Sequence, residues 1–151
     1  MSLVLSSSGG GSVTLQEPAT ASTRTLTLPD VTGNVLASTG AIGYTTGVGG
    51  TVTQATSKAT GVTLNALSGQ ITLNNAALAA STTVSFTLTN SNIAASDVLV
   101  LNHSSAGTAG SYVLNAQCAA GSASINVRNV SAGSLSEAIV ISFAIIKAVT
   151  A

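Results

Sequence analysis

The chain has 151 residues, of which only 5% are charged, against roughly 25% in an ordinary soluble domain. The four basic and four acidic residues cancel and are scattered, so the sequence lacks the clustered Lys and Arg that nucleic-acid binding requires. The single cysteine, Cys118, cannot form an intrachain disulfide, so an oxidising compartment is not indicated. We expect one domain with an appendage, whose uncharged surface of Ser, Thr, Asn and Gly is partly buried against partner subunits.

The N-terminal residues Met1–Leu5 carry neither a basic region nor a long apolar run, so we expect no signal peptide. The apolar run at 144–146 is far too short for a transmembrane span. The sequence therefore predicts synthesis in a cytosol, with no membrane insertion.

Residues 1–40 are predicted to form an extended arm. The Ser/Gly run at 6–12 is typical of a flexible segment, and short alternating pieces follow at 13–15 and 25–28. These pieces carry too few large apolar residues to close a core, so we expect them to pair with sister chains or with a docking surface. The apolar residues predicted to dock the arm are Leu3, Val4, Leu5, Val13, Leu15, Leu26 and Leu28.

Residues 41–151 are predicted to form a separate head domain. The glycine-rich segment 43–50 predicts a loop or hinge, and a short strand is expected at 51–54. Alternating stretches at 61–65 and 70–74 predict two strands joined by a turn at 67–69. Only the segment 75–80 permits a helix, and it is too short for more than a turn or so.

The clearest strand pattern is at 83–89, where Val84, Phe86 and Leu88 alternate with Ser and Thr. Further strands are predicted at 97–101, 112–118, 122–130 and 138–149, with turn residues between them. About eight short strands without a useful helix indicate an all-β fold. We expect an antiparallel, jelly-roll-like β-sandwich.

Two strands, 98–101 and 139–146, are apolar on both faces. Such strands are covered on both sides, so we expect one side in the sandwich core and the other in a subunit interface. The last strand is predicted to run near the symmetry axis of an oligomer, because a free apolar edge would invite aggregation. The candidate residues for a trimer interface are Ile139, Ile141, Phe143 and Ile145.

Two passages resemble known proteins. Residues 23–35, Thr-Arg-Thr-Leu-Thr-Leu-Pro-Asp-Val-Thr-Gly-Asn-Val, are similar to a motif of phage fibre and appendage proteins that precedes a trimeric shaft or head. The passage from Ile42-Gly43-Tyr44 to the closing segment 127–138 resembles a domain common among phage and prophage virion proteins. The resemblance implies a homotrimeric component of the virion surface, made in the bacterial host cytoplasm and contacting capsid or other virion proteins.

Length favours the phage head over the tail. The sequence has no heptads, collagen-like triplets or repeats, which the long shaft of a receptor-binding tail fibre would need. An arm with one domain suits a capsid decoration protein or short head fibre. The alternative is a tail- or collar-borne fibre tip that binds a bacterial surface glycan, and a bacterial surface protein is disfavoured by the absence of a secretion signal.

We expect no enzymatic activity, no cofactor and no metal. His103 is the only histidine and has no predicted catalytic partner, while a pairing of Asp97 with Glu137 has no supporting motif. Tyr112 and His103 are the candidate glycan contacts. The alternatives are that Tyr112 caps the core or an interface, and that His103 ends a strand facing solvent, a subunit interface or an ion on a threefold axis.

Overall fold

The computed structural model describes residues 3–6, 9–10, 12–15, 43–44 and 47–148. The chain divides into two units, Met1–Ala37 and Ser38–Ala151, a division three residues from the one predicted from composition. The second unit is the head.

The first unit contains a β-hairpin of β1 (Leu3–Ser6) and β2 (Ser12–Leu15). The strands are antiparallel, with Leu3 opposite Leu15 and Ser6 opposite Ser12. Segment 13–15 was expected to pair with a sister chain or a docking surface; in the structure it pairs along one edge with residues 3–6 of its own chain. The docking role of these strands stays a prediction, and Leu26 and Leu28 lie outside the described residues.

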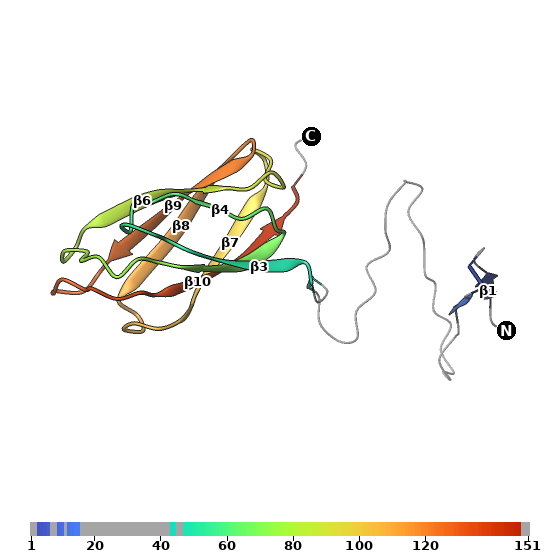
Figure 1. Ribbon diagram of the computed structural model, residues 1–151, viewed down its shortest axis with the longest axis horizontal. Coiled ribbons are helices and arrows are strands. Elements are labelled where there is room, and N and C mark those ends of the chain that lie inside the picture. The colour runs from blue at the N-terminus through green and yellow to red at the C-terminus, as the bar shows by residue number, and fades with distance from the viewer. Residues whose placement is uncertain (1–2, 7–8, 11, 16–42, 45–46, 149–151) are drawn as a thin grey trace, which may run out of the picture. The chain divides into compact units, whose positions relative to one another are not determined.

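The head is a sandwich of two four-stranded sheets (Figure 1). The described residues contain ten strands and no helix, which confirms the all-β prediction. The first sheet has the order β3 (Gly49–Thr53), β5 (Ser68–Thr72), β10 (Val140–Ile146), β7 (Val98–Ser105). The second sheet has the order β4 (Val62–Thr63), β6 (Thr83–Thr89), β9 (Ser122–Asn129), β8 (Tyr112–Ala119).

Strands β3 to β6 alternate between the two sheets along the chain. Each crossing reverses the chain direction, so every second strand returns to its sheet in the same direction. Consequently β3 is parallel to β5, and β4 is parallel to β6, whereas all other pairs are antiparallel. These two parallel edge pairs are the departure from the purely antiparallel arrangement that was expected.

The turn predicted at 67–69 is wrong, because Ser68 and Gly69 belong to β5. A Cβ atom on Gly69 would lie 2.6 Å from the backbone oxygen of Gly50, so the glycine permits close approach of two strands. Gly50 itself lies in β3, not in the predicted loop, and a Cβ there would meet Leu64 at 2.7 Å. In this pair of strands glycine therefore marks tight packing and not a turn.

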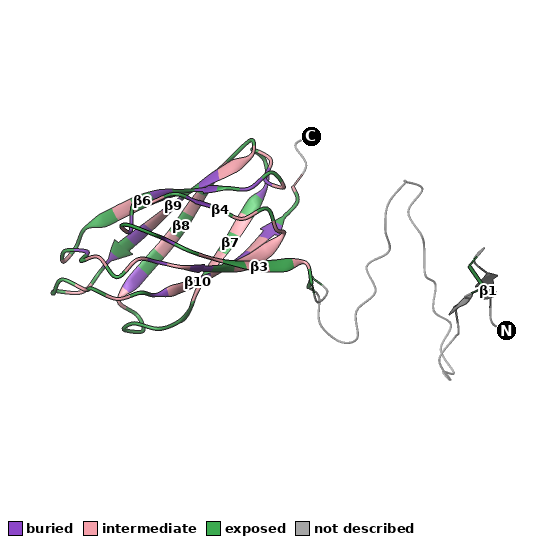
Figure 2. Ribbon diagram, viewed as in Figure 1, coloured by how far each residue is buried: buried purple, intermediate pink, exposed green. Residues whose placement is uncertain are grey.

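The core lies between the sheets, where alternate residues of each strand point inward (Figure 2). Ile71, Leu88, Ile125, Ile141 and Ile145 are fully buried. Burying one such side chain stabilises the fold by roughly 1.5–3 kcal/mol. The period-two pattern of the sequence therefore becomes one apolar layer shared by both sheets.

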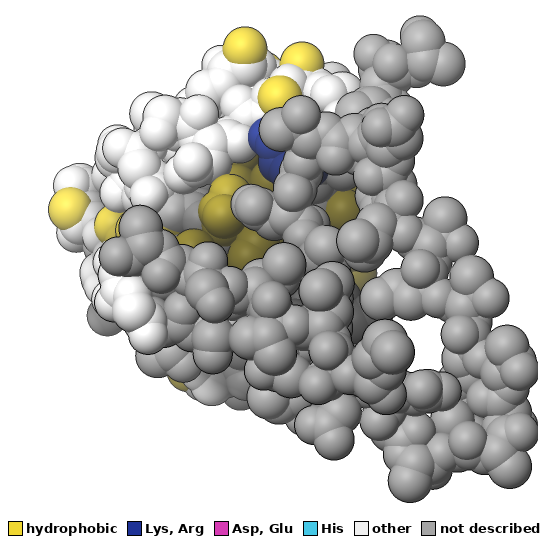
Figure 3. Space-filling view, turned by 90° about the vertical axis from the view of Figure 1, so that its right-hand side faces the viewer, with side chains coloured by type: hydrophobic (Ala, Val, Ile, Leu, Met, Phe, Trp, Pro, Cys, Tyr) yellow, Lys and Arg dark blue, Asp and Glu magenta, His cyan; other side chains and the backbone are white. Residues whose placement is uncertain are grey.

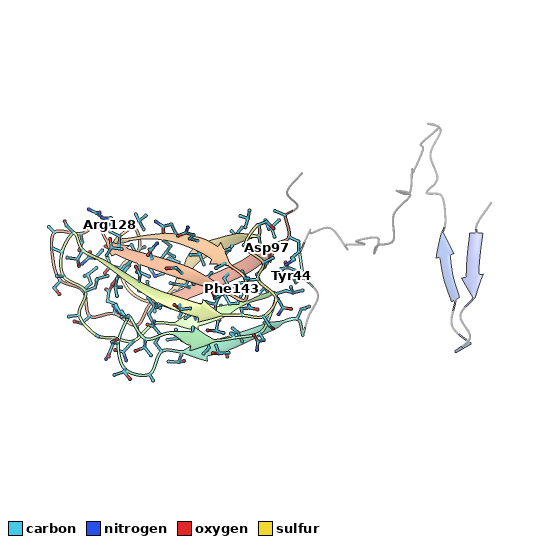
Figure 4. The ribbon with its side chains drawn as sticks, turned by 90° about the horizontal axis from the view of Figure 1, so that it is seen from above. Tyr44, Asp97, Arg128 and Phe143 are labelled. Atoms are coloured by element: carbon cyan, nitrogen blue, oxygen red, sulfur yellow. The ribbon has the colours of Figure 1, made fainter. Side chains whose placement is uncertain are left out.

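The chain enters and leaves the head at the same end of the sandwich. Gly49 at the start of β3 and Ala144 near the end of β10 are both paired with Ser68 of β5. We call this the entry end. Asp97 and Tyr44 lie there, whereas Arg128 lies at the opposite, far end (Figure 4).

Candidate interaction surfaces

The outer face of the first sheet carries no ionisable side chain. Its strands turn alternate residues outward, and these are hydroxyl, amide or aliphatic. We call this surface the first-sheet face. Its members are Thr51, Thr53, Ser68, Gln70, Thr72, Val98, Val100, Asn102, Val140, Ser142, Ala144 and Ile146.

An apolar patch occupies the entry end of this face. Ala144 lies opposite Val100 and Ile146 opposite Val98, so the four side chains form two neighbouring cross-strand pairs on β7 and β10. Val98 is 52% exposed, Val100 46% and Ile146 55%. Large aliphatic side chains this exposed and this close together are typical of an interaction site.

Charged groups at the entry end are tied to the fold. The ammonium of Lys147 donates to the carboxylate of Asp97, which also accepts the backbone N–H of Ala94 at 2.8 Å. The hydrogen bond from Lys147 holds the pKa of Asp97 below its usual value. The Tyr44 hydroxyl donates to the carbonyl of Ile145. Seen from this end, hydrophobic side chains gather beside a basic one (Figure 3).

The outer face of the second sheet, which we call the second-sheet face, is polar and linked by hydrogen bonds. The Asn126 amide donates to the Asn115 side-chain oxygen at 2.6 Å and accepts from the Ser85 hydroxyl, so one row spans β6, β9 and β8. Arg128 and Val113 form an adjacent pair, and Val113 is 51% exposed. Val130, 45% exposed, follows just beyond β9 with its backbone N–H bonded to the carbonyl of Ser111. This face therefore combines lateral hydrogen bonds with one cation between two exposed valines.

A carboxylate organises the far end. Glu137 accepts the Tyr112 hydroxyl at 2.8 Å, the Thr108 hydroxyl at 2.6 Å and the Thr108 backbone N–H at 3.1 Å. Hydrogen bonds from Thr108 hold the pKa of Glu137 below its usual value, and burial raises the pKa of Tyr112. Gly107, at φ +68°, has no room for a Cβ, which would lie 2.5 Å from Ile139 Cγ2. The cluster fixes the loop between β7 and β8.

The two candidate glycan contacts do come together, with the rings of His103 and Tyr112 5.6 Å apart in an edge-to-face arrangement. Tyr112 is only 8% exposed, however, so its ring offers no open face on which a sugar could stack. Tyr112 as a sugar platform is therefore wrong, and the alternative reading, that it caps the core, describes its position. His103 does not end the strand, since β7 continues to Ser105; it is half-buried, with Nε2 2.6 Å from the carbonyl oxygen of Ala106.

The predicted interface residues Ile139, Ile141, Phe143 and Ile145 are corrected. They are at most 3% exposed, because the chain's own second sheet covers them. Because β10 was expected to be apolar on both sides, either set of alternate residues could have formed the interface, and the odd-numbered residues were assigned to it. Alternation places these four in the core and turns Val140, Ala144 and Ile146 toward the outer face.

Two fully buried asparagines, which the sequence reading missed, hold the loops at the two ends. The Asn129 amide donates to the carbonyls of Leu78 and Gly133 and accepts the backbone N–H of Ser131. Asn90 donates to the carbonyl of Ala66 at the entry end. The available signal was the pattern Asn-Xaa-Asn/Ser, which favours a side chain closing a turn two residues on.

Lys58 was also missed. Only 3% exposed, it donates to the carbonyls of Asn74 and Glu137, and burial lowers its pKa. Its neighbour Gln54 donates to the carbonyls of Lys58 and Thr60 and accepts the backbone N–H of Asn74. No local sequence signal distinguishes this lysine from a solvated one, because its acceptors are distant backbone carbonyls.

Within the described ranges, no cluster of three or more His, Cys, Asp or Glu side chains gathers as a metal site would need. The described residues also contain no helix of the length and apolar character needed to cross a bilayer. No family model matches the chain, and none of the curated proteins or solved structures resembles it closely enough to count as a match.

Proposed function

We propose that this chain is a non-enzymatic structural protein of a phage particle, a trimeric capsid decoration protein or short head fibre that attaches through its N-terminal arm. The observation that carries the proposal is the layout of the head. The chain enters and leaves at one end, and the apolar patch lies at that end. The assignment to a phage particle rests on the resemblance of residues 23–35 to phage fibre and appendage proteins and of residues 42–138 to a domain of phage and prophage virion proteins.

The layout supports attachment at one end and projection at the other. An arm that precedes β3 reaches a capsid from the entry end, which leaves the far end pointing outward. The far-end loops are fixed by Glu137, Asn129 and Lys58, so an outward position would not need a partner to order them.

The two acidic groups that the structure describes, Asp97 and Glu137, do not form a pair of the kind that cleaves glycosides. Asp97 precedes β7 at the entry end and Glu137 lies at the far end, so the length of an eight-residue strand, roughly 25 Å, separates them. Carboxylates that cleave glycosides together lie within about 10 Å of each other. Each is also engaged in structural hydrogen bonds, Asp97 with Lys147 and Glu137 with Thr108.

Attachment is tested on particles of the encoding phage that lack their own copy. Purified full chain and a variant without residues 1–40 are added, and bound protein is quantified after the particles are sedimented. We expect the full chain to bind and the truncated chain to lose binding. Normal binding of the truncated chain would contradict docking through the arm.

Electron microscopy with gold-labelled antibody then locates the protein. Label on the capsid supports the decoration role. Label on the tail or collar, together with adherence of residues 41–151 to host cells, would replace it with the alternative, a fibre tip that binds a bacterial surface glycan.

A further inference from the structure

We infer that the first-sheet face is the surface through which copies of this chain associate, with the apolar patch of Val98, Val100, Ala144 and Ile146 against a second copy. The inference rests on the proposed function only for the expectation that the chain assembles. What it adds to the proposed function is that the first sheet is the one covered, and that a second copy of the chain covers it.

The electrostatics of this face permit self-association. Copies arranged around a threefold axis bring the same side chains together at that axis, so like charges there would meet, and burying an unpaired charge is strongly unfavourable. None of the outward residues of β3, β5, β10 and β7 is ionisable, so the face has no charge to repel its copy or to be desolvated. Of the nearby charged pair, Asp97 directly precedes β7 and Lys147 directly follows β10, so both would stay at the rim.

The second-sheet face is a poorer candidate. Its polar side chains are already joined by Asn126 to Ser85 and Asn115, and Arg128 would have to be desolvated in any contact between copies. Val113 is as exposed as Val98 but is paired with that arginine, and the next exposed valine, Val130, lies on the other side of the arginine just beyond β9. Only the first sheet therefore carries directly paired, exposed apolar side chains with no charge among them.

The size of the face indicates what else the assembly needs. Four strands of five to eight residues give a flat area on the order of 400 Å², from spacings of about 4.8 Å and 3.3 Å. Stable interfaces bury about 800 Å² on each partner. The first-sheet face alone is therefore about half of that area, so a stable assembly needs contacts beyond it.

The test measures the mass of the full chain in solution by light scattering and native mass spectrometry. The double variant Val98→Asp/Val100→Asp places carboxylates in the patch. The matched control, Val113→Asp, places one at an equally exposed valine of the other face. We expect three copies for the unmodified chain and for the control, and a dissociation constant raised about 100-fold or more for the double variant.

Circular dichroism and thermal melting of each variant separate loss of assembly from loss of fold. A cross-linking measurement avoids the introduced charges: in a Cys118→Ser background, Val100→Cys should be joined between copies by a short bis-maleimide, and Val113→Cys should not. Equal cross-linking of both would overturn the assignment.

An unchanged mass of a folded double variant would also overturn the inference, while leaving attachment to particles to be decided by its own experiment. A single-chain mass for the unmodified protein would remove self-association altogether. Binding of that single chain to particles would still support the proposed structural role.

Discussion

The two outer faces of the sandwich arise from the same period-two alternation yet differ in what they present to solvent. On the second sheet, Ser85, Asn126 and Asn115 bond to one another, and Arg128 adds a charge. On the first sheet, Val100 and Ile146 stand exposed among uncharged side chains. The second-sheet face is mainly polar and hydrogen-bonded, whereas the first-sheet face exposes an apolar patch to solvent.

The difference shows that exposure alone does not identify an interface. Val98 and Val113 are 52% and 51% exposed, but only Val98 has apolar neighbours across the strand pair. Contiguity and the absence of charge distinguish them. The variants below test whether the faces differ in the way that this geometry requires, in order of expected effect.

The largest expected effect comes from comparing a core residue and a patch residue of the same strand, β10. Ile141→Ala should lower the free energy of unfolding by about 2–5 kcal/mol, because it leaves a cavity between the sheets. Ile146→Ala, measured by urea denaturation at a concentration where copies are dissociated, should change it by about 0.5 kcal/mol or less. Similar losses for both would show that the outer face supports the fold of the single chain.

A buried amide and a surface amide give the next comparison. Asn129→Ala removes a fully buried amide that donates to the carbonyls of Leu78 and Gly133 and accepts the backbone N–H of Ser131, so we expect a loss of about 1–3 kcal/mol. Asn126→Ala interrupts the exposed row on the second-sheet face and should cost about 0.5 kcal/mol or less, since water replaces its partners. Urea titrations of both variants measure these losses in unfolding free energy. A larger loss for Asn126→Ala than expected would show that the hydrogen-bonded row on the second-sheet face stabilises the fold.

Adjacent residues of β8 test the alternation directly. Tyr112→Phe removes the hydroxyl bonded to Glu137 and should cost about 0.5–1.5 kcal/mol. Val113→Ala, on the opposite side of the strand, should leave the unfolding free energy within about 0.5 kcal/mol. A stability unchanged by Tyr112→Phe would contradict the role of Tyr112 in fixing the far end.

The smallest expected effect concerns acid. The pKa of Asp97 in the fold is lowered below its usual 3.8 by the bond from Lys147. Its contribution to stability is therefore present above that usual value and is lost as the pH falls through the lowered pKa. The melting temperature of Asp97→Asn should be below that of the unmodified chain at pH 7, and the gap should close toward about pH 2. A gap in melting temperature that does not change with pH would show that the charge on Asp97 does not stabilise the fold.

The sequence predicts the strands well where apolar and polar residues alternate without interruption. It fails where one residue type, such as glycine, is common both in turns and in tightly packed strands. Residues 83–89 are a strand as predicted, because Val, Phe and Leu alternate with Ser and Thr without interruption. Gly50 and Gly69 were misread as loop and turn residues, since tight strand packing and turns both favour glycine. The parallel pairing of β3 with β5 follows from alternation between sheets, which no local pattern reveals.

The candidate site was predicted less well than the fold. Recognition that β7 and β10 are apolar on both sides was sound, but sequence alone does not say which parity faces the second sheet. The odd-numbered residues, such as Ile141, were therefore assigned to the interface although they form the core. Tyr112 was misjudged for a related reason, because its partner Glu137 is 25 residues away in the sequence.

The central claim, that one face is covered by copies of the chain and the other is open, is tested most directly by hydroxyl-radical footprinting of the unmodified full chain. Val98 and Val113 have nearly equal exposure in the single chain, so a monomer should label them alike. The account predicts that Val98, Val100 and Ile146 are protected at assembling concentrations while Val113 is labelled, and that dilution removes the protection. Equal labelling of Val98 and Val113 at every concentration would contradict it.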